Sequence, residues 1–334
     1  MSLPLALTMG EPAGIGGEIA LKAWTERDVA AVPPFFAIDD PARLAGLAAQ
    51  LGLAVPVRRI AEAADAARIF PGALPVLPQK LMRPSIPGKP DPANAPAVIA
   101  AIERAATLVR THRAGAMVTN PIQKEALYAA GFKYPGHTEF LGHLAGIDHP
   151  IMMLAGPELR VVPVTVHLSI AEALASLTTE AIVTAGRVTA TALQRDFGIA
   201  RPRLAVAALN PHAGEGGAMG REEIEIIAPA VRALAALGIA VSGPAPADTL
   251  FHPAARRRYD AVICMYHDQA LIPLKTIDFE RGVNVTLGLP FVRTSPDHGT
   301  ALDIAGQGVA DPASLIAALK LAGAMAARHA ALLV

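Results

Sequence analysis

The chain has 334 residues, of which 52% are hydrophobic, and this length is enough for about two domains with buried cores. Its 29 basic residues equal its 29 acidic residues and no block of like charge occurs, which argues against nucleic acid as a partner. The single cysteine, Cys264, excludes an internal disulfide and a thiolate metal cluster, and it fits a reducing cytoplasm.

The apolar segments are too short or too interrupted to cross a membrane, since Lys320 and Arg328 break even the alanine-rich C-terminal stretch. The start of the sequence, MSLPLALTMGEPAG, lacks a basic leader and runs directly into a strand-like pattern. We therefore expect neither a signal peptide nor a membrane anchor.

Short apolar runs bounded by turn residues recur along the chain and predict strands that are covered on both faces. They are LPLALTM, PFFAI, GAMVTN, PIMMLAG, RVVPVTVH, RLAVAALN, YDAVICMY and VNVTLG. Longer segments of helical periodicity separate most of these runs, at residues 97–112, 179–196, 222–237 and 312–332. The alternation predicts an α/β fold with a largely parallel sheet.

Residues 71–96 stand apart from this alternation because they contain eight prolines. Each proline removes a backbone donor and fixes φ, so we expect no regular element in this segment. Its exit, Asp91-Pro92, has the pattern of a helix N-cap followed by proline at the first helical position. The segment is either an interdomain linker or a surface excursion near a cleft.

Three histidines occupy matching positions after apolar runs. His167 ends RVVPVTVH, His212 follows RLAVAALN, and His267 ends YDAVICMYH. Ligands of parallel α/β sheets bind outside the carboxyl ends of the strands, so three imidazoles there could converge on a Zn, Co or Mn ion and leave coordination positions open. Asp268 would then orient His267. The alternative is that each histidine is a satisfied polar residue or a helix cap, and Asp268 an N-cap.

Two further stretches have residues suited to binding an anion. Residues 136–139, Gly-His-Thr-Glu, follow a proline and open an apparent helix, where backbone N–H groups and the hydroxyl of Thr138 would receive an anion. The alternative is an ordinary capping box on Thr138. Lys275, Asn284 and Arg293 each lie beside an apolar run, and they would grip a phosphate or carboxylate unless they are solvated surface groups.

Two glycine-rich turns come close to nucleotide-binding motifs without matching them. In NPHAGEGGAMGREE, residues 210–223, a dinucleotide fingerprint would need glycine where Met219 stands. MGEPAGIGGEI, residues 9–19, fits neither that fingerprint nor the P-loop. We interpret the glycines of the second stretch as structural, because they permit a tight turn and close backbone approach.

The chain resembles the 4-hydroxythreonine-4-phosphate dehydrogenase family of the pyridoxal-phosphate pathway. Six motifs carry the resemblance in the expected order: GEPAGIGGE, TNPIQKEAL, GHTEFL, LNPHAGEGGAMGREE, YDAVICMYHDQALIPLK and TSPDHGTALDIAG. The last motif also resembles a loop of isopropylmalate and isocitrate dehydrogenases. The resemblance therefore implies that fold rather than a Rossmann fold, with two α/β/α domains flanking a cleft and a homodimer whose active sites are shared.

The resemblance also implies the cofactors and the site residues. NAD would be held by the loop that contains His298, Gly299, Thr300 and Asp303. One divalent metal ion, Zn, Mg or Co, would bind the same three histidines that the strand ends indicate. The substrate contacts are expected at His137, Thr138, Lys275, Asn284 and Arg293. Either His137 or, as second candidate, Lys275 would act as the base.

The implied domains are interleaved. Residues 1–125 and 245–334 would form the nucleotide-side domain, and residues 126–244 the second domain, with metal ligands and dimer contacts. The implied reaction oxidises 4-phosphooxy-L-threonine with NAD to 2-amino-3-oxo-4-phosphooxybutanoate, which then loses carbon dioxide to give 3-amino-2-oxopropyl phosphate.

Other activities fit parts of this pattern. Related dehydrogenases act on phospho-threonate, phospho-erythronate or an aromatic dihydrodiol, but the phosphate-binding set favours a phosphorylated substrate. Phosphate acyltransferases share the general fold without needing the three histidines. A metal hydrolase would keep the histidines but have no use for the loop DHGTALDIAG, and a non-catalytic binding protein would not need both an open metal site and a cofactor loop.

Overall fold

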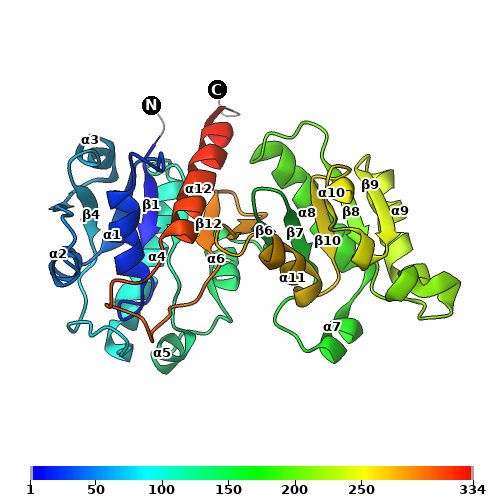
Figure 1. The fold of residues 1–334 in the computed structure, drawn as a ribbon, viewed down its shortest axis with the longest axis horizontal. Helices are drawn as coiled ribbons and strands as arrows, with labels where there is room; N and C mark the ends of the chain where they lie inside the picture. The colour runs from blue at the N-terminus through cyan, green and yellow to red at the C-terminus, as the bar shows by residue number, and fades with distance from the viewer. Residues whose placement is uncertain (1–2, 332–334) are drawn as a thin grey trace. The chain divides into compact units, whose positions relative to one another are not determined.

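The computed structural model describes residues 3–331 and divides the chain into two compact units. The first unit comprises the chain up to Pro150 and from Leu289 onward, and the second comprises Ile151–Gly288 (Figure 1). Both contain strands and helices, so the predicted α/β class is confirmed. No helix within residues 3–331 is long and apolar enough to cross a membrane.

The first unit has a fully parallel set of strands in the order β3-β4-β2-β1-β5-β12. The strands are β1 (Leu5–Thr8), β2 (Phe35–Asp39), β3 (Val57–Arg59), β4 (Leu74–Pro78), β5 (Met117–Thr119) and β12 (Arg293–Pro296). The helices are α1 (Gly16–Thr25), α2 (Pro41–Gln50), α3 (Ala66–Ile69), α4 (Ala95–Arg110), α5 (Lys124–Ala129), α6 (His137–Ala145) and α12 (Ala313–Ala331).

The strands of the first unit are buried on both faces, as their continuous apolar runs predict. Ala6 and Phe36 belong to a core cluster with residues of α4. The residues next to them in the strands, Leu5 and Phe35, point to the opposite face and are fully buried as well. Because successive side chains of a strand point to opposite faces, helices must cover both. Helix α1 contacts both α2 and α12 (Figure 1).

The second unit has the strand order β11-β6-β7-β10-β8-β9, in which only β6 pairs antiparallel with its neighbours. Its strands are β6 (Ile151–Ala155), β7 (Arg160–Pro163), β8 (Arg203–Ala207), β9 (Ala240–Ala245), β10 (Ala261–Cys264) and β11 (Val283–Leu287). Its helices are α7 (Ile170–Ser176), α8 (Thr179–Arg195), α9 (Ala228–Ala236), α10 (Pro253–Arg256) and α11 (His267–Ile277), with a π-helical turn at Glu223–Ile227.

The contacts divide the chain later than the sequence pattern suggested, at 150/151 and 288/289 instead of 125/126 and 244/245. Helices α5 and α6 stay with the first unit because Phe132, Phe140 and Leu141 join its core cluster. Strands β10 and β11 pair with β7, β8 and β6, which places them in the second unit. All three strand-end histidines therefore lie in the second unit.

The proline-rich segment contains a regular strand, contrary to the expectation of none. Strand β4 runs from Leu74 to Pro78 between β2 and β3. The register with β2 begins at Val76, so Pro75 precedes this ladder, and Pro78 is the last strand residue, where a missing donor is tolerated. The segment lies inside the first unit and is not an interdomain linker. Its exit is as predicted, because Asp91 Oδ1 accepts the Ala93 N–H at 2.9 Å.

Candidate active site

The second unit brings the three strand-end histidines to one edge of its sheet. They follow β7, β8 and β10, which are adjacent parallel strands with β10 in the middle, so their carboxyl ends lie together. Buried Gln269 ties two of these ends together: its Nε2 donates to the Ala208 carbonyl at 2.7 Å, and its Oε1 accepts the Met265 N–H at 2.7 Å. Sequence reasoning assigned no role to Gln269.

His167 and His267 are the pair that the structure places side by side. The pairing of β7 with β10 continues beyond both strands, since Val164 N–H donates to the Cys264 carbonyl at 2.8 Å and Thr165 Oγ1 donates to the Met265 carbonyl at 2.8 Å. The two imidazole centroids are 6.3 Å apart. This spacing follows from the extended pairing of the two chain segments.

Asp268 has the orienting contact that its position suggested. Its Oδ1 lies 2.7 Å from Nδ1 of His267, and an Nδ1–H that donates to it leaves Nε2 as the coordinating nitrogen. His267 is the first residue of α11, whose N-cap is Tyr266, so Asp268 is not the N-cap of this helix.

His212 enters the same edge of the sheet from an unusual backbone turn. Residues 212–216 all have positive φ, including the non-glycine residues His212 (51°), Ala213 (53°) and Glu215 (43°). Such left-handed residues are strained and persist only when their surroundings fix them. The glycines at 214 and 216 explain why this stretch resembles a nucleotide loop in composition although its spacing does not match one.

Glu223 fixes the start of this turn. Its Oε1 accepts the backbone N–H groups of Leu209 and Asn210 at 2.9 and 2.8 Å, and its Oε2 lies 3.0 Å from the side-chain amide of Asn210. Burial acts to raise the pKa of Glu223, but the hydrogen bonds from Asn210, Glu223's own backbone and Leu209 outweigh it and lower the pKa. From the sequence, Glu223 was expected only to begin a helix.

The three histidines have the donor atoms that a divalent metal prefers, but their side chains are not close enough together to hold one. Neutral imidazoles are suitable ligands for Zn or Co, and His267 is already oriented through Asp268. Within residues 3–331, however, no group of three or more His, Cys, Asp or Glu side chains is close enough to hold a metal ion. His167, His212 and His267 would be the ligands if a metal binds, and residues 3–331 of this protomer do not bring the three together.

The first unit contains the residues at the start of α6 that were expected to bind an anion. Gly136 is the N-cap of this nine-residue helix and no side chain caps it, so Thr138 does not form the capping box that was the alternative. Among the described residues, no side chain accepts from the first N–H groups of this helix, and its positive dipole end would favour an anion. Nε2 of His137 is shielded from solvent and has no hydrogen-bond partner among the described residues.

Arg293 supplies a buried cation to this site. It is only 3% exposed in β12, and its Nη2 donates to Oγ1 of Thr119 at 2.6 Å. Burial lowers the pKa of Arg293 to about 10, while Glu139 opposes that shift. Burial, Arg293 and Lys124 all lower the pKa of His137 well below its usual value. His137 is thus neutral at pH 7, and the local excess of positive charge favours an anionic ligand.

Lys124 and Thr119 are site residues that no role was assigned to from the sequence. A side-chain carbon at Gly136 would lie 4.0 Å from Lys124 Nζ, which brings the amine to the start of α6. The signal was present in the motif TNPIQKEAL, because a strand end carrying a threonine and a nearby lysine is a typical place for an anion ligand.

The remaining expected substrate residues belong to the second unit. Lys275 lies in the last turn of α11, with its Nζ 5.4 Å from the ring centroid of Phe279. Asn284 is in β11, and its Oδ1 is buried without a hydrogen-bond partner among residues 3–331. The placement of both residues is compatible with ligand binding.

The loop expected to bind NAD is packed against the first glycine-rich turn. The Thr300 carbonyl accepts the Ile15 N–H at 3.0 Å, and a side-chain carbon at Gly14 would lie 2.8 Å from that same carbonyl oxygen. Close approach therefore requires glycine at position 14, as the structural interpretation predicted. His298 Nδ1 is 2.9 Å from the Gly299 carbonyl, and Asp303 offers an exposed carboxylate.

Solved structures of known enzymes resemble the whole chain. A 4-hydroxythreonine-4-phosphate dehydrogenase from Klebsiella pneumoniae is 40% identical, with a TM-score of 0.89 over 98% of both chains. A terephthalate 1,2-cis-dihydrodiol dehydrogenase from Burkholderia xenovorans is 32% identical, with a TM-score of 0.66 over 97% of this chain and 98% of that chain. A branched-chain phosphotransacylase from Enterococcus faecalis, 12% identical with a TM-score of 0.54 over 96% of this chain and 99% of that chain, shares the fold alone.

The fold and its neighbours place the chain in the class of α/β oxidoreductases. A 4-hydroxythreonine-4-phosphate dehydrogenase from Caulobacter vibrioides is 57% identical over 98% of this chain and 99% of its own length. The family model of the pyridoxal phosphate biosynthetic protein PdxA matches residues 32–322. The chain belongs to the PdxA family.

Proposed function

We propose that the protein oxidises 4-phosphooxy-L-threonine with NAD to 2-amino-3-oxo-4-phosphooxybutanoate, which decarboxylates to 3-amino-2-oxopropyl phosphate, in the biosynthesis of pyridoxal 5'-phosphate. The observation that carries the proposal is the cationic site at the start of α6, where buried Arg293, neutral His137 and an uncapped helix end favour a phosphorylated substrate. The relatives that bear this name at 51–57% identity support the same activity.

The residues of the first unit would bind and orient the substrate phosphate. Arg293 offers a fixed guanidinium because Thr119 holds one of its nitrogens, and the N–H groups at the start of α6 add dipoles that need no reorganisation. Thr138 adds a hydroxyl. Lys275 and Asn284 would help to neutralise and orient the phosphate and carboxylate of the substrate.

His137 is the first candidate for the base. Its lowered pKa keeps it neutral at pH 7, so its free Nε2 can accept a proton from the substrate hydroxyl. Lys275 is the second candidate. When bound, a divalent metal on His167, His212 and His267 would lower the pKa of the reacting hydroxyl, and NAD on the loop at 298–303 would accept the hydride.

We also propose a homodimer whose subunits share active sites. The described protomer has no complete group of three metal ligands, and apolar side chains near His167 are exposed: Leu168 is 48% and Ile170 75% exposed. Mixing inactive His212→Ala and His267→Ala variants after dissociation would restore some activity if these two ligands come from different subunits. No restoration with either mixing order would contradict that arrangement. We also propose that the protein functions in the cytoplasm, because its single cysteine, Cys264, is buried and forms no disulfide.

The decisive experiment follows NADH formation with 4-phosphooxy-L-threonine, phospho-threonate, phospho-erythronate and an aromatic cis-dihydrodiol, before and after chelation and with added Zn, Mg or Co. We expect turnover with the first substrate, loss on chelation and recovery with metal. Turnover confined to the dihydrodiol would assign the chain to the other branch, and no NAD reduction with any alcohol would refute the dehydrogenase proposal.

A further inference from the structure

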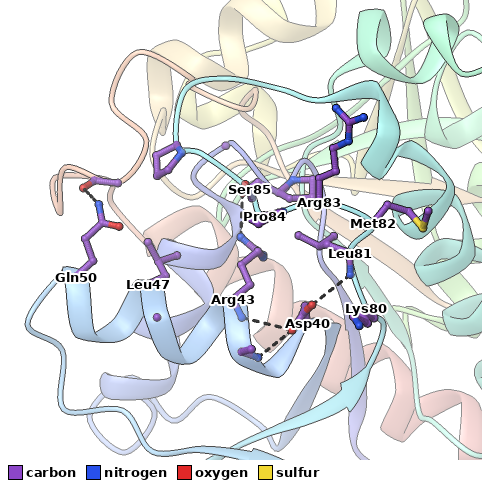
Figure 2. Close-up of a pocket in the computed structure, with 16 residues that line it drawn as sticks. Asp40, Arg43, Leu47, Gln50, Lys80, Leu81, Met82, Arg83, Pro84 and Ser85 are labelled. Atoms are coloured by element: carbon purple, nitrogen blue, oxygen red, sulfur yellow. Dashed lines mark hydrogen bonds between the residues drawn. The ribbon is translucent and has the colours of Figure 1, made fainter.

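A separate pocket of about 590 Å³ lies in the first unit, beside α2 and the proline-rich segment (Figure 2). It is at the carboxyl ends of β2 and β4, where ligands of parallel sheets bind. Its walls include the turn at Pro12 to Gly14, the α2 residues Arg43 and Leu47, the segment from Lys80 to Ser85, and Gly306. Its volume is within the range of about 300–1,000 Å³ that is usual for small-molecule sites.

The pocket lining carries more positive than negative charge. Arg43, Lys80 and Arg83 line it together with one carboxylate, Asp40. That carboxylate is already engaged, because its oxygens accept the N–H groups of Ala42 at 2.9 Å and Leu81 at 3.2 Å (Figure 2). Two of the cations also have carboxylate partners outside the lining, Arg43 with Asp39 and Arg83 with Asp91 at 3.7 Å, so an anionic ligand would meet Lys80 and share Arg83 with Asp91.

The walls of the pocket are held in place before any ligand binds. Arg43 Nε and Nη2 donate to Asp39 at 3.0 and 2.5 Å, and Arg43 Nη1 donates to the Pro12 carbonyl at 3.0 Å. On the opposite rim, buried Asn94 bonds the backbone of Arg83 through both its amide atoms, at 3.0 and 3.1 Å. The proline-rich segment thus forms a fixed wall, and its prolines limit the entropy that binding would cost.

The apolar part of the lining suits a flat ring. Leu47, Leu81 and Met82 line the pocket beside the cations (Figure 2). The hydroxyl of Ser85 is shielded from solvent and has no hydrogen-bond partner within the described part of the chain. A ligand with an apolar ring, hydrogen-bonding ring edges and a phosphate would match the apolar side chains, the Ser85 hydroxyl and the cations of the lining.

Hydrogen bonds connect the walls of the pocket to the chain segments next to the loop expected to bind NAD. Gln50 Nε2 donates to the Gly306 carbonyl at 3.2 Å, and the Gly88 N–H donates to the Ala13 carbonyl at 2.8 Å. The next residues of that turn pack on Thr300 through the bond from Ile15. A dinucleotide that contacts residues 298–303 therefore has a built cavity within the same unit for one of its halves.

We propose that this pocket binds the adenosine monophosphate half of the dinucleotide, with the adenine against Leu47 and Met82 and a phosphate toward Lys80 and Arg83. The inference rests on the proposed NAD-dependent function. It assigns a role to the proline-rich segment and adds residues to the cofactor site beyond the loop at 298–303.

The test measures binding of AMP, adenosine and nicotinamide mononucleotide by calorimetry, and the KM for NAD by steady-state kinetics. Gly46 lines the pocket, and a side-chain carbon there meets no atom within 4 Å, so Gly46→Leu would fill the cavity without disturbing α2. Gly72 also has open space around it but lies outside the pocket lining, so Gly72→Leu is the matched control.

We expect Gly46→Leu to weaken AMP binding and raise the KM for NAD by about tenfold or more, with Gly72→Leu unchanged. A Lys80→Gln, Arg83→Gln double variant should weaken AMP about tenfold and adenosine hardly at all. Three results would each overturn the inference. They are failure of AMP to bind the unmodified protein, equal effects of the two glycine variants, and a loss of nicotinamide mononucleotide binding in Gly46→Leu while AMP binding is unchanged. Because calorimetry needs no substrate, AMP binding is tested even if no alcohol is oxidised.

Discussion

Glu223 accepts both the backbone N–H and the side-chain amide of Asn210, two residues before His212. The carboxylate also accepts the N–H of Leu209, so one side chain holds three donors at the entry to the left-handed turn. A side-chain carbon at Gly214 would lie 2.6 Å from Glu223 Oε2, which shows how tightly the turn packs on this group. The strained conformation of His212 therefore depends on an anchor eleven residues further along the chain.

Replacing Glu223 with alanine should leave the partly buried backbone donors of Leu209 and Asn210 without their acceptor and lower the free energy of unfolding by about 1–3 kcal/mol. The same variant should bind metal more weakly, because His212 loses its fixed backbone. Urea unfolding and a competition assay with a chelator measure the two effects. Glu225 forms an exposed ion pair with Arg221, so Glu225→Ala is the control and should change stability by less than about 1 kcal/mol. Equal effects of the two variants would show that Glu223 does not anchor the turn.

The lowered pKa of His137 predicts a pH dependence of stability. Burial is its largest cause, followed by Arg293 and Lys124, so the folded state binds a proton less readily than the unfolded state. The unfolded chain gains that proton as the pH falls through about 6.5, and the free energy of unfolding therefore decreases with acidification below that pH. Ligand-free wild-type protein should lose more stability between pH 7.5 and 5 than His137→Asn does. A difference between the two proteins that stays constant over this range would contradict the assignment.

Arg293→Lys keeps the charge but loses the planar fork that Thr119 orients. We expect the KM for the phosphorylated substrate to rise about tenfold or more, with little change in the KM for NAD. Steady-state kinetics with each substrate varied in turn gives both constants. Exposed Arg281, which pairs with Asp278 at 2.8 Å, provides the control Arg281→Lys. Parallel increases in both KM values would argue that Arg293 does not bind the substrate.

Gly10 is the glycine whose replacement should cost most in the first turn. Its φ is +66°, and a side-chain carbon there would lie 2.6 Å from both the Asn120 Cβ and the Pro121 carbonyl oxygen. Asn120 cannot easily withdraw, because its amide donates to the carbonyls of Thr8 and Gly16 at 3.1 and 3.2 Å. Gly10→Ala should lower the free energy of unfolding by about 2 kcal/mol, measured in urea. Gly72→Ala, in open space, should stay within about 0.5 kcal/mol, and a comparable loss there would refute the packing argument.

The sequence predicted the parts of the fold that local patterns encode. The long apolar runs became β1, β2, β5 and other central strands, because burial on both faces leaves a continuous apolar signal. It missed β3, β9 and β12, which are short or exposed or carry polar residues such as Arg293. Strand β4 was missed for another reason, since its two prolines sit where the ladder needs no donor.

The candidate site was predictable where one residue follows one strand, and not where residues act through others. His167 and His267 could be placed at strand ends from their spacing, and their proximity then followed from strand order. Gln269 could not be assigned, because its side chain bonds to Ala208, 61 residues away in sequence. Glu223 could not be assigned either, because its bonds to Leu209 and Asn210 depend on how the intervening turn folds back. The division into units was equally hidden, since it depends on which strands pair.

Helix α6 begins at His137 after the N-cap Gly136, and no side chain among the described residues caps it; buried Arg293 lies nearby. The first backbone N–H groups of the helix therefore lack a side-chain acceptor, and a bound phosphate would supply one. The substrate would then stabilise the helix that binds it. Substrate binding would slow the hydrogen exchange of the first backbone amides of α6.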